Sequence, residues 1–341
     1  MLLQFTVLDA QSSVVSNAEA LGMSSERLDK ITSKWENYID NKQLSGAVIY
    51  VARKGTPVYF EAIGQSDIAK KRSMEKDAIF RIASQSKAIV SLGVMMLQED
   101  GLLRINDPLG KYIEEFNETT VAEVQEDGSY IVVPAKRKMT IRDLLTHTSG
   151  LGYGYGPAAD QWKAADMQGW YFAHREEPIL ETVKRMASLP MDRHPGSTFW
   201  YGYSTDVLGA LIEVVSGQSY EDYIQNHIMA PVGMNRSAAI YHNLKTKENI
   251  AEAHKVEKGE VIQIEAYDEN RAIGAAFDCP AKAIHDLLER ESRLDRREIP
   301  HKRGNLLAFH SRGGGGQRLP PACRAQLAVF AHIGPIKPLT T

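Results

Sequence analysis

The sequence feature best suited to chemistry is a serine followed three residues later by a lysine, Ser84 and Lys87. Side chains three apart on a helix share a face, so the lysine amine can reach the serine hydroxyl. Burial penalises the ammonium form and favours a neutral amine that accepts a proton. A helix N-terminus also presents N–H groups to a developing oxyanion. These features indicate acyl transfer. Ser86 lies between the two residues, but the residue three positions after it is Ile89, so only Ser84 has a base.

Other reactive motifs are absent from the sequence. No Gly-x-Ser-x-Gly elbow occurs, and the glycine run 313–316 continues with Gln317 and Arg318 instead of the Gly-Lys-Ser/Thr of a phosphate-binding loop. Two cysteines, Cys279 and Cys323, make neither a disulfide framework nor a Cys-x-x-Cys pair, and the ten histidines show no ligand spacing. We therefore expect no metal and no cofactor.

Composition excludes several classes of protein. The chain has 341 residues, of which 43% are hydrophobic and 24% charged, an ordinary globular balance. A net charge of -3 offers no basic excess for a phosphate backbone, so we expect no nucleic-acid partner. No run approaches the roughly 18 apolar residues of a membrane-spanning helix, and the opening residues lack a basic flank or a cleavage site. We expect a soluble, cytoplasmic protein with a small-molecule substrate; the oligomeric state is left open.

The elements that must position Ser84 can be read from hydrophobic periodicity and turn residues. Two β-rich runs, 46–53 and 57–64, flank a short turn and predict an antiparallel hairpin. The most apolar helical segment is 85–100, which we expect to be central because it is apolar on nearly every side. Further helices are predicted at 25–40, 140–147, 177–188, 204–216 and 218–229. Strands followed by helices indicate an α+β fold with an inserted helical region.

The C-terminal part of the chain has a different composition. After residue 270 arginine replaces lysine as the main basic residue, both cysteines occur, and tyrosine and tryptophan are missing. We divide the chain into an extension at 1–24, a domain at 25–276 and a divergent Arg/Gly/Pro-rich tail at 277–341. A separate segment, a disordered tail and a frame-shifted C-terminus all fit this composition.

Three separated blocks, Phe80–Ile89, Leu97–Leu109 and Leu144–Leu151, resemble the serine β-lactamase and penicillin-binding-protein superfamily. More narrowly, the chain looks like the class C β-lactamase-like esterases, or family VIII carboxylesterases. The resemblance covers about residues 25–275. It implies a β-lactamase/transpeptidase-like fold, in which helices flank an antiparallel sheet and a helical region is inserted.

The resemblance also implies a tyrosine that shuttles protons, on a loop after a Pro-Gly turn. The matching stretch starts at Pro195 and puts Tyr201 at this position, with Tyr203 as the alternative. Tyr203 stands where β-lactamases of this class carry an asparagine that holds the lactam side chain, so we expect it to line the substrate site and to favour simple esters. The same resemblance gives His147 a structural place in a turn instead of the role of a base.

A third family motif, on an edge strand, completes the oxyanion hole through a backbone N–H group. Neither Lys-Thr-Gly nor Trp-Gly-Gly occurs, and a His-x-Gly match is found at His332, although His194 also begins such a tripeptide. We take His332 as the candidate substrate-binding residue of this motif.

The sequence therefore predicts a serine carboxylesterase that hydrolyses small esters through a Ser84 acyl-enzyme, with Lys87 and Tyr201 as general base and acid. A β-lactamase or D-alanyl-D-alanine carboxypeptidase shares every step up to deacylation and remains an alternative. A catalytically inactive protein of the penicillin-binding type is a second alternative, because the sequence lacks the Lys-Thr-Gly and Trp-Gly-Gly forms of the third motif.

Overall fold

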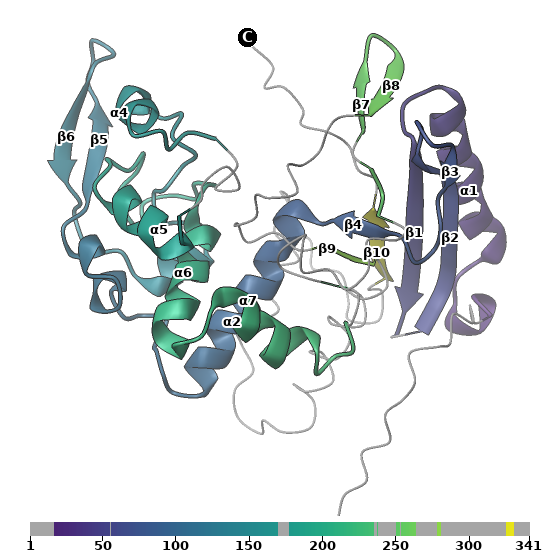
Figure 1. Cartoon of the computed structure of the whole chain (residues 1–341), viewed down its shortest axis with the longest axis horizontal. Helices are drawn as coiled ribbons and strands as arrows, with labels where there is room; N and C mark the ends of the chain where they lie inside the picture. The colour runs from purple at the N-terminus through teal and green to yellow at the C-terminus, as the bar shows by residue number, and fades with distance from the viewer. Residues whose placement is uncertain are drawn as a thin grey trace, which may run out of the picture.

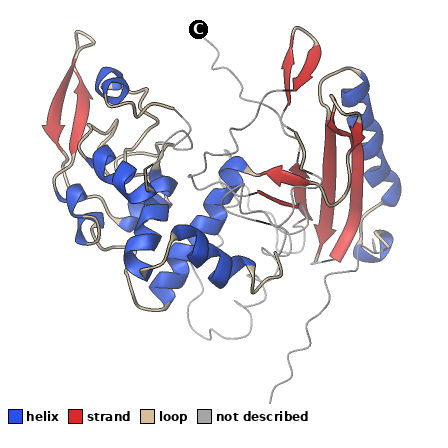
Figure 2. Cartoon of the chain, viewed as in Figure 1, coloured by secondary structure: helices blue, strands red, loops and turns tan. Residues whose placement is uncertain are grey.

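The computed structural model of the chain describes residues 17–54, 56–169, 177–234, 237, 250–252 and 254–263, and the backbone of residues 278–280 and 325–330. Figure 1 shows a part built on an antiparallel sheet and a part built from helices, with α2 (Ser86–Glu99) lying between them. Colouring by secondary structure makes the same division plain (Figure 2). The expected α+β class is thus confirmed.

The main sheet contains four strands of the described residues in the order β10-β1-β2-β3, and each neighbouring pair is antiparallel. The strands are β1 (Gly46–Arg53), β2 (Thr56–Asp67), β3 (Arg72–Ser73) and β10 (Ala325–Phe330). The predicted hairpin is confirmed, because β1 and β2 pair from Gly46 opposite Gly64 to Arg53 opposite Thr56.

Strand β1 is covered on both faces, which explains its continuous apolar run. Side chains alternate along a strand, so neighbouring residues face opposite sides of the sheet. Ala47, Ile49 and Val51 belong to a small core beneath α1 (Ser25–Asp40), which Figure 1 shows against this face. The alternate residues belong to the main core on the other side: Val48, Tyr50 and Ala52. Helix α1 is capped at its N-terminus by Ser24, whose hydroxyl accepts a hydrogen bond from the Arg27 N–H.

The helical part follows the predicted segments closely. Besides α1 and α2, the α-helices of the described residues are α3 (Ile141–Leu145), α4 (Ala159–Ala164), α5 (Ile179–Ala187), α6 (Ser204–Ser216) and α7 (Tyr220–Ile224). Shorter helical turns are η1 (Glu19–Leu21), η2 (Ala83–Gln85), η3 (Leu109–Lys111), η4 (Glu114–Asn117) and the π-helical η6 (Gln225–Met229). The predicted helices are confirmed, and α4 is an addition.

Helix α2 forms the centre of the molecule, as its apolar sequence predicts. It packs against α6 and α7, and its buried residues include Ile89, Val90 and Val94. At Gly93 an added Cβ would lie 3.1 Å from side-chain methyls of both Ile212 and Ile224. Glycine at this position therefore allows α6 and α7 to approach α2 closely. This packing along the whole of α2 also fixes the position of its first residues.

Three two-stranded sheets complete the described fold. They are β5 (Thr120–Val124) with β6 (Tyr130–Pro134), β7 (His254–Glu257) with β8 (Glu260–Gln263), and β4 (Ile79–Arg81) with β9 (Asp278–Pro280). Within the described part of the chain, no helix combines the length and apolar character needed to cross a bilayer.

Two strands come from the region predicted as a divergent tail, 277–341. Strand β9 pairs with β4, and β10 pairs with β1 from Val48 opposite Phe330 to Arg53 opposite Ala325. Both strands therefore belong to sheets whose other strands lie in the first 81 residues. The division of the chain at residue 276 stays a prediction.

Candidate active site

Ser84 lies in the helical turn η2, between strand β4 and helix α2. The turn is closed by a 2.9 Å hydrogen bond from the Gln85 N–H to the Ile82 carbonyl. Ser84 is exposed, whereas Ser86 is fully buried. Of the two serines, the structure therefore presents only Ser84 to a substrate, which is the serine with lysine at the required spacing.

Two predicted residues, Tyr201 and Lys87, meet at the Ser84 hydroxyl, and together with Ser84 they form what we call the Ser84 group. Ser84 Oγ accepts a hydrogen bond from the Tyr201 hydroxyl at 2.8 Å and a longer one from the Lys87 amine at 3.4 Å. The Lys87 amine also lies over the Tyr201 ring, 4.9 Å from the ring centroid. A nucleophile in contact with two groups that can exchange a proton is the arrangement that acyl transfer requires.

Tyr201 reaches Ser84 because its loop is bound to the loop that follows α3. The Gly196 N–H donates to the Thr148 carbonyl at 2.7 Å, and the Trp200 N–H donates to the His147 carbonyl at 2.7 Å. At Gly202 an added Cβ would lie 2.2 Å from the Leu151 carbonyl oxygen, so only glycine permits this approach. Backbone contacts on both sides of Tyr201 thus fix where its side chain begins.

The loop after α3 is itself held by the buried carboxylate of Asp143. This side chain accepts hydrogen bonds from Arg137 at 2.7 and 2.8 Å and from Thr140 at the start of α3. Thr148 Oγ1 donates to the same carboxylate at 3.1 Å. Although burial favours the neutral acid, these bonds and the Arg137 charge hold the pKa of Asp143 below its usual value. A charged Asp143 therefore joins both ends of the turn that contains His147.

His147 lies beside the Ser84 group without a hydrogen bond to it in the described structure. Its ring centroid is 4.9 Å from that of Tyr201 and 5.8 Å from that of Phe199, and only 6% of the residue is exposed. Burial, with a smaller effect of the Lys87 charge, lowers the pKa of His147 to about 4. The imidazole is therefore neutral near pH 7 and packs under the Tyr201 ring.

The structure does not bring Tyr203 to the Ser84 group. The residue is 2% exposed, its ring stacks on Trp162, and its hydroxyl donates to the carbonyls of Met167, at 3.1 Å, and Gly169. The side chain thus belongs to the core behind the site, because the residue after the Gly202 contact turns inward as α6 begins. A direct substrate contact by Tyr203 stays a prediction without geometric support.

His332 lies outside the described residues. Strand β10 ends at Phe330, two residues earlier, and occupies an outer position of the described sheet beside β1. The assignment of His332 to the third family motif stays a prediction.

Two polar residues next to the Tyr201 loop, Tyr153 and Asp192, were not predicted from the sequence. Tyr153 lies between the rings of Tyr201 and Tyr203, with centroid distances of 6.0 and 5.0 Å, and burial raises the pKa of its hydroxyl. Asp192 is a buried carboxylate that bonds the Trp200 indole. The alternating glycines between 150 and 156 were the available signal, because such spacing is typical of close backbone approach.

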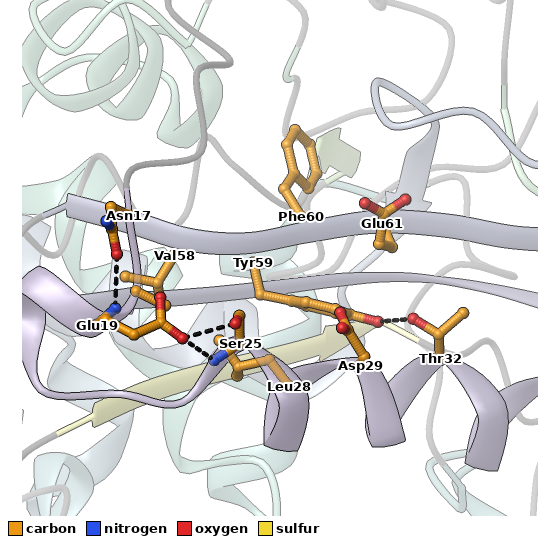
Figure 3. A pocket seen from close by; sticks show the side chains of 11 residues that line it. Asn17, Glu19, Ser25, Leu28, Asp29, Thr32, Val58, Tyr59, Phe60 and Glu61 are labelled. Atoms are coloured by element: carbon orange, nitrogen blue, oxygen red, sulfur yellow. Dashed lines mark hydrogen bonds between the residues drawn. The ribbon is translucent and has the colours of Figure 1, made fainter.

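Figure 3 shows a separate pocket between α1 and β2, in which Thr32 and Tyr59 share a 2.5 Å hydrogen bond. Glu19 accepts hydrogen bonds from Ser25 in the same place. The lining contains none of the residues of the Ser84 group: Asn17, Ala18, Glu19, Ser25, Leu28, Asp29, Thr32, Val58, Tyr59, Phe60 and Glu61.

Fold and site geometry agree with the comparisons to known proteins. The Beta-lactamase family model matches residues 31–268, which is well over half of the sequence, and the chain belongs to this family. Esterase EstB of Burkholderia gladioli is 35% identical over 212 residues, covering 61% of this chain and 50% of the esterase. Lovastatin esterase of Penicillium rubens is 28% identical over 204 residues, covering 58% of this chain and 50% of the relative. The chain thus spans about half the length of these curated relatives.

Solved structures of similar fold include EstCE1, described as a hydrolase with promiscuous acyltransferase activity. It superposes with a TM-score of 0.64 at 22% identity, covering 80% of this chain and 72% of EstCE1. The unliganded simvastatin synthase LovD of Aspergillus terreus gives a TM-score of 0.63 at 21% identity, covering 79% of this chain and 69% of LovD. These likenesses confirm the β-lactamase-like fold.

Proposed function

We propose that this chain is a serine carboxylesterase that hydrolyses small carboxylic esters through an acyl-enzyme on Ser84. The observation that carries the proposal is the meeting of Tyr201 and Lys87 at the Ser84 oxygen. Family membership supports it, and so do the printed names of two relatives, Esterase EstB and Lovastatin esterase.

Acylation starts when Ser84 Oγ attacks the ester carbonyl. The Ser84 proton passes to the Lys87 and Tyr201 pair, the carbonyl π electrons move to oxygen, and a tetrahedral oxyanion forms. When this intermediate collapses, the bond to the alcohol oxygen breaks and the pair returns the proton to the leaving alkoxide. An alcohol leaves, and the acyl group stays on Ser84.

Deacylation uses the same groups in reverse. Water enters beside the ester carbonyl of the acyl-enzyme and gives a proton to the Lys87 and Tyr201 pair as its oxygen attacks. The second tetrahedral intermediate then releases Ser84 Oγ, which recovers the proton, and the carboxylic acid leaves. Exposure of Ser84 and of 41% of Tyr201 gives water direct access to this bond.

Esters are preferred over lactams in this proposal because of the residue at position 203. The family asparagine expected there is replaced by Tyr203, whose hydroxyl donates to main-chain carbonyls inside the protein. No side-chain amide is therefore offered at that position to hold the substituent of a lactam ring.

The test is hydrolysis of p-nitrophenyl butyrate by the purified chain and its Ser84→Ala variant. Removal of the nucleophile should lower kcat/KM by about 10³-fold or more, with an unchanged circular dichroism spectrum. Ser91→Ala, a partly buried serine on α2, is the matched control and should keep its activity. Equal rates from the parent and Ser84→Ala would refute the esterase, and turnover of nitrocefin without ester turnover would favour the lactamase alternative.

A further inference from the structure

A buried carboxylate, Asp192, lies behind the loop that carries Tyr201. Only 3% of the residue is exposed, and its Oδ2 accepts a 2.7 Å hydrogen bond from the indole N–H of Trp200. Its own backbone N–H donates to the Gly150 carbonyl at 2.9 Å. Asp192 therefore connects the glycine-containing segment 150–156 to the residue that precedes Tyr201.

Two glycines make room for this carboxylate. An added Cβ would lie 2.0 Å from Asp192 Oδ2 at Gly152 and 1.8 Å from Asp192 Oδ1 at Gly156. Real Cβ atoms do not approach oxygen so closely, so any larger residue at either position would displace the carboxylate. The backbone of the segment is thus shaped around Asp192.

Trp200 is fixed by three different contacts. Its indole N–H bonds Asp192, its backbone N–H donates to the His147 carbonyl at 2.7 Å, and the Arg193 guanidinium lies 4.2 Å from the centre of its ring. The backbone contact sets the path of the chain, whereas the Asp192 bond sets the rotation of the indole. Trp200 and Gly202 together hold Tyr201 from both sides.

A contribution to stability alone does not explain Asp192, because burying a carboxylate costs free energy. Burial raises the pKa of its carboxyl, although the Trp200 bond and the Arg193 charge act in the opposite direction. Its Oδ1 has no hydrogen-bond partner among the described residues. A buried carboxylate that is only half satisfied is usually destabilising compared with an apolar residue, so its presence calls for another role.

We propose that Asp192 is a positioning residue for the Ser84 reaction, acting through the Trp200 indole to place the Tyr201 hydroxyl against Ser84. The inference rests on the proposed esterase function. It concerns the position of a proton-transferring group, so it predicts a change in the rate of the chemical step and little change in substrate binding.

The first measurement compares kcat and KM of Asp192→Ala, Asp192→Asn and Trp200→Phe with the parent, using p-nitrophenyl butyrate. Displacement of a reacting group by about 1 Å can cost roughly 10²-fold in rate, so Asp192→Ala should lower kcat by about that factor with KM within about 2-fold. Trp200→Phe keeps a ring but loses the donor, and it should match Asp192→Ala. Asp192→Asn keeps an oxygen acceptor for Trp200 and should recover most of the rate.

A double-mutant cycle separates positioning from general destabilisation. If Asp192 acts only through Tyr201, then Asp192→Ala should change kcat by less than about 3-fold when Tyr201 is already phenylalanine. Asp160→Ala is the matched control, because its carboxylate also accepts a hydrogen bond from an aromatic side chain, the Tyr130 hydroxyl at 2.7 Å, outside the Ser84 group. That variant should retain parental kcat.

The outcomes are distinguishable. A parental rate in Trp200→Phe, or equal losses caused by Asp192→Ala with and without Tyr201, would overturn the positioning role while leaving the esterase intact. If the unsubstituted chain shows no Ser84-dependent hydrolysis, both the proposed function and this inference fall. If Asp192→Ala does not fold, Trp200→Phe and Asp192→Asn still decide the question.

Discussion

At the scale of single residues, the two contacts to Ser84 are unequal. The Tyr201 hydroxyl donates to Ser84 Oγ at 2.8 Å, whereas the Lys87 amine is 3.4 Å away, at the long end for a hydrogen bond. Tyr201 must release its own proton before it can accept one from Ser84. The Lys87 amine lies over the Tyr201 ring and within reach of Ser84 Oγ, so it is the second group that can take part in the proton transfer. The geometry therefore favours a shared proton path over a single base.

The lowered pKa of buried His147 predicts how the stability of the folded protein depends on pH. The folded protein holds its pKa near 4, against 6.5 for a histidine without perturbation, because the ring is buried. Between these values the unfolded chain binds a proton that the folded protein does not, so stability falls as pH falls from 6.5 towards 4. The loss is on the order of 3 kcal/mol, and below about pH 4 the residue adds nothing further.

Urea unfolding at pH 7 and at pH 4.5 measures this effect. A His147→Gln variant keeps a polar side chain of similar size that does not titrate, so its stability should fall less than that of the parent between the two pH values. Exposed His227→Gln is the control and should behave like the parent. Equal losses in the parent and His147→Gln would contradict the buried, neutral state of His147.

At the scale of elements, periodicity predicted what local sequence encodes. Helix α2 is apolar on most sides and α1 has a clear apolar stripe, so both were predicted within one or two residues. Helix α4 was missed because six residues give too short a periodic signal. The β5–β6 hairpin was missed although its turn contains Asp127 and Gly128, which are typical hairpin residues.

The candidate site was predictable to the extent that its residues are neighbours in sequence. Ser84 and Lys87 are three residues apart, so helix geometry alone suggested their contact. Tyr201 is 117 residues from Ser84, and only a family resemblance joined them. Asp192 could not be found in either way, because its bond to Trp200 depends on how two loops fold back on the 150–156 segment.

The substitution Gly152→Ala is a direct test of this loop arrangement. In Gly152→Ala the new Cβ would lie 2.0 Å from Asp192 Oδ2 and 2.8 Å from the Trp200 indole nitrogen, so one of the two partners must move. We expect kcat for p-nitrophenyl butyrate to fall by about 10-fold or more, because Tyr201 follows Trp200. The variant should still fold, since the contact lies in a loop.

The control for Gly152→Ala is Gly128→Ala in the β5–β6 turn. Gly128 has φ +83° and no atom within 4 Å of an added Cβ, so alanine there strains the backbone without touching the site. The strain costs about 1 kcal/mol and should leave kcat unchanged. A parental kcat in Gly152→Ala would show that the carboxylate and indole tolerate displacement.

At the scale of the whole molecule, a strand from the C-terminal region, β10, pairs with the first strand of the described sheet. Strand β10 covers the edge of β1 along six residue pairs, from Val48 opposite Phe330 to Arg53 opposite Ala325. Without it, β1 would be an apolar strand with unpaired N–H and C=O groups, which is a template for aggregation. The divergent composition after residue 276 therefore does not prevent this region from contributing to the fold.

Two truncations separate the structural and chemical contributions of this region. A chain that ends at Arg324 lacks β10, and the lost ladder should lower Tm by about 5 °C or more and promote aggregation. A chain that ends at Ala331 keeps β10 but lacks His332, so it should retain the parental Tm. Differential scanning calorimetry gives Tm, and p-nitrophenyl butyrate kinetics on the same samples give activity.

The kinetic result assigns the third family motif. If His332 belongs to the substrate site, the chain ending at Ala331 should lose kcat/KM by about 10²-fold, the typical effect of one missing oxyanion donor, at unchanged Tm. Full activity in that chain would place the missing donor in another part of the molecule. An unchanged Tm in the chain ending at Arg324 would contradict the pairing of β10 with β1. Because stability and rate are measured on both truncations, loss of the strand and loss of the motif cannot be mistaken for each other.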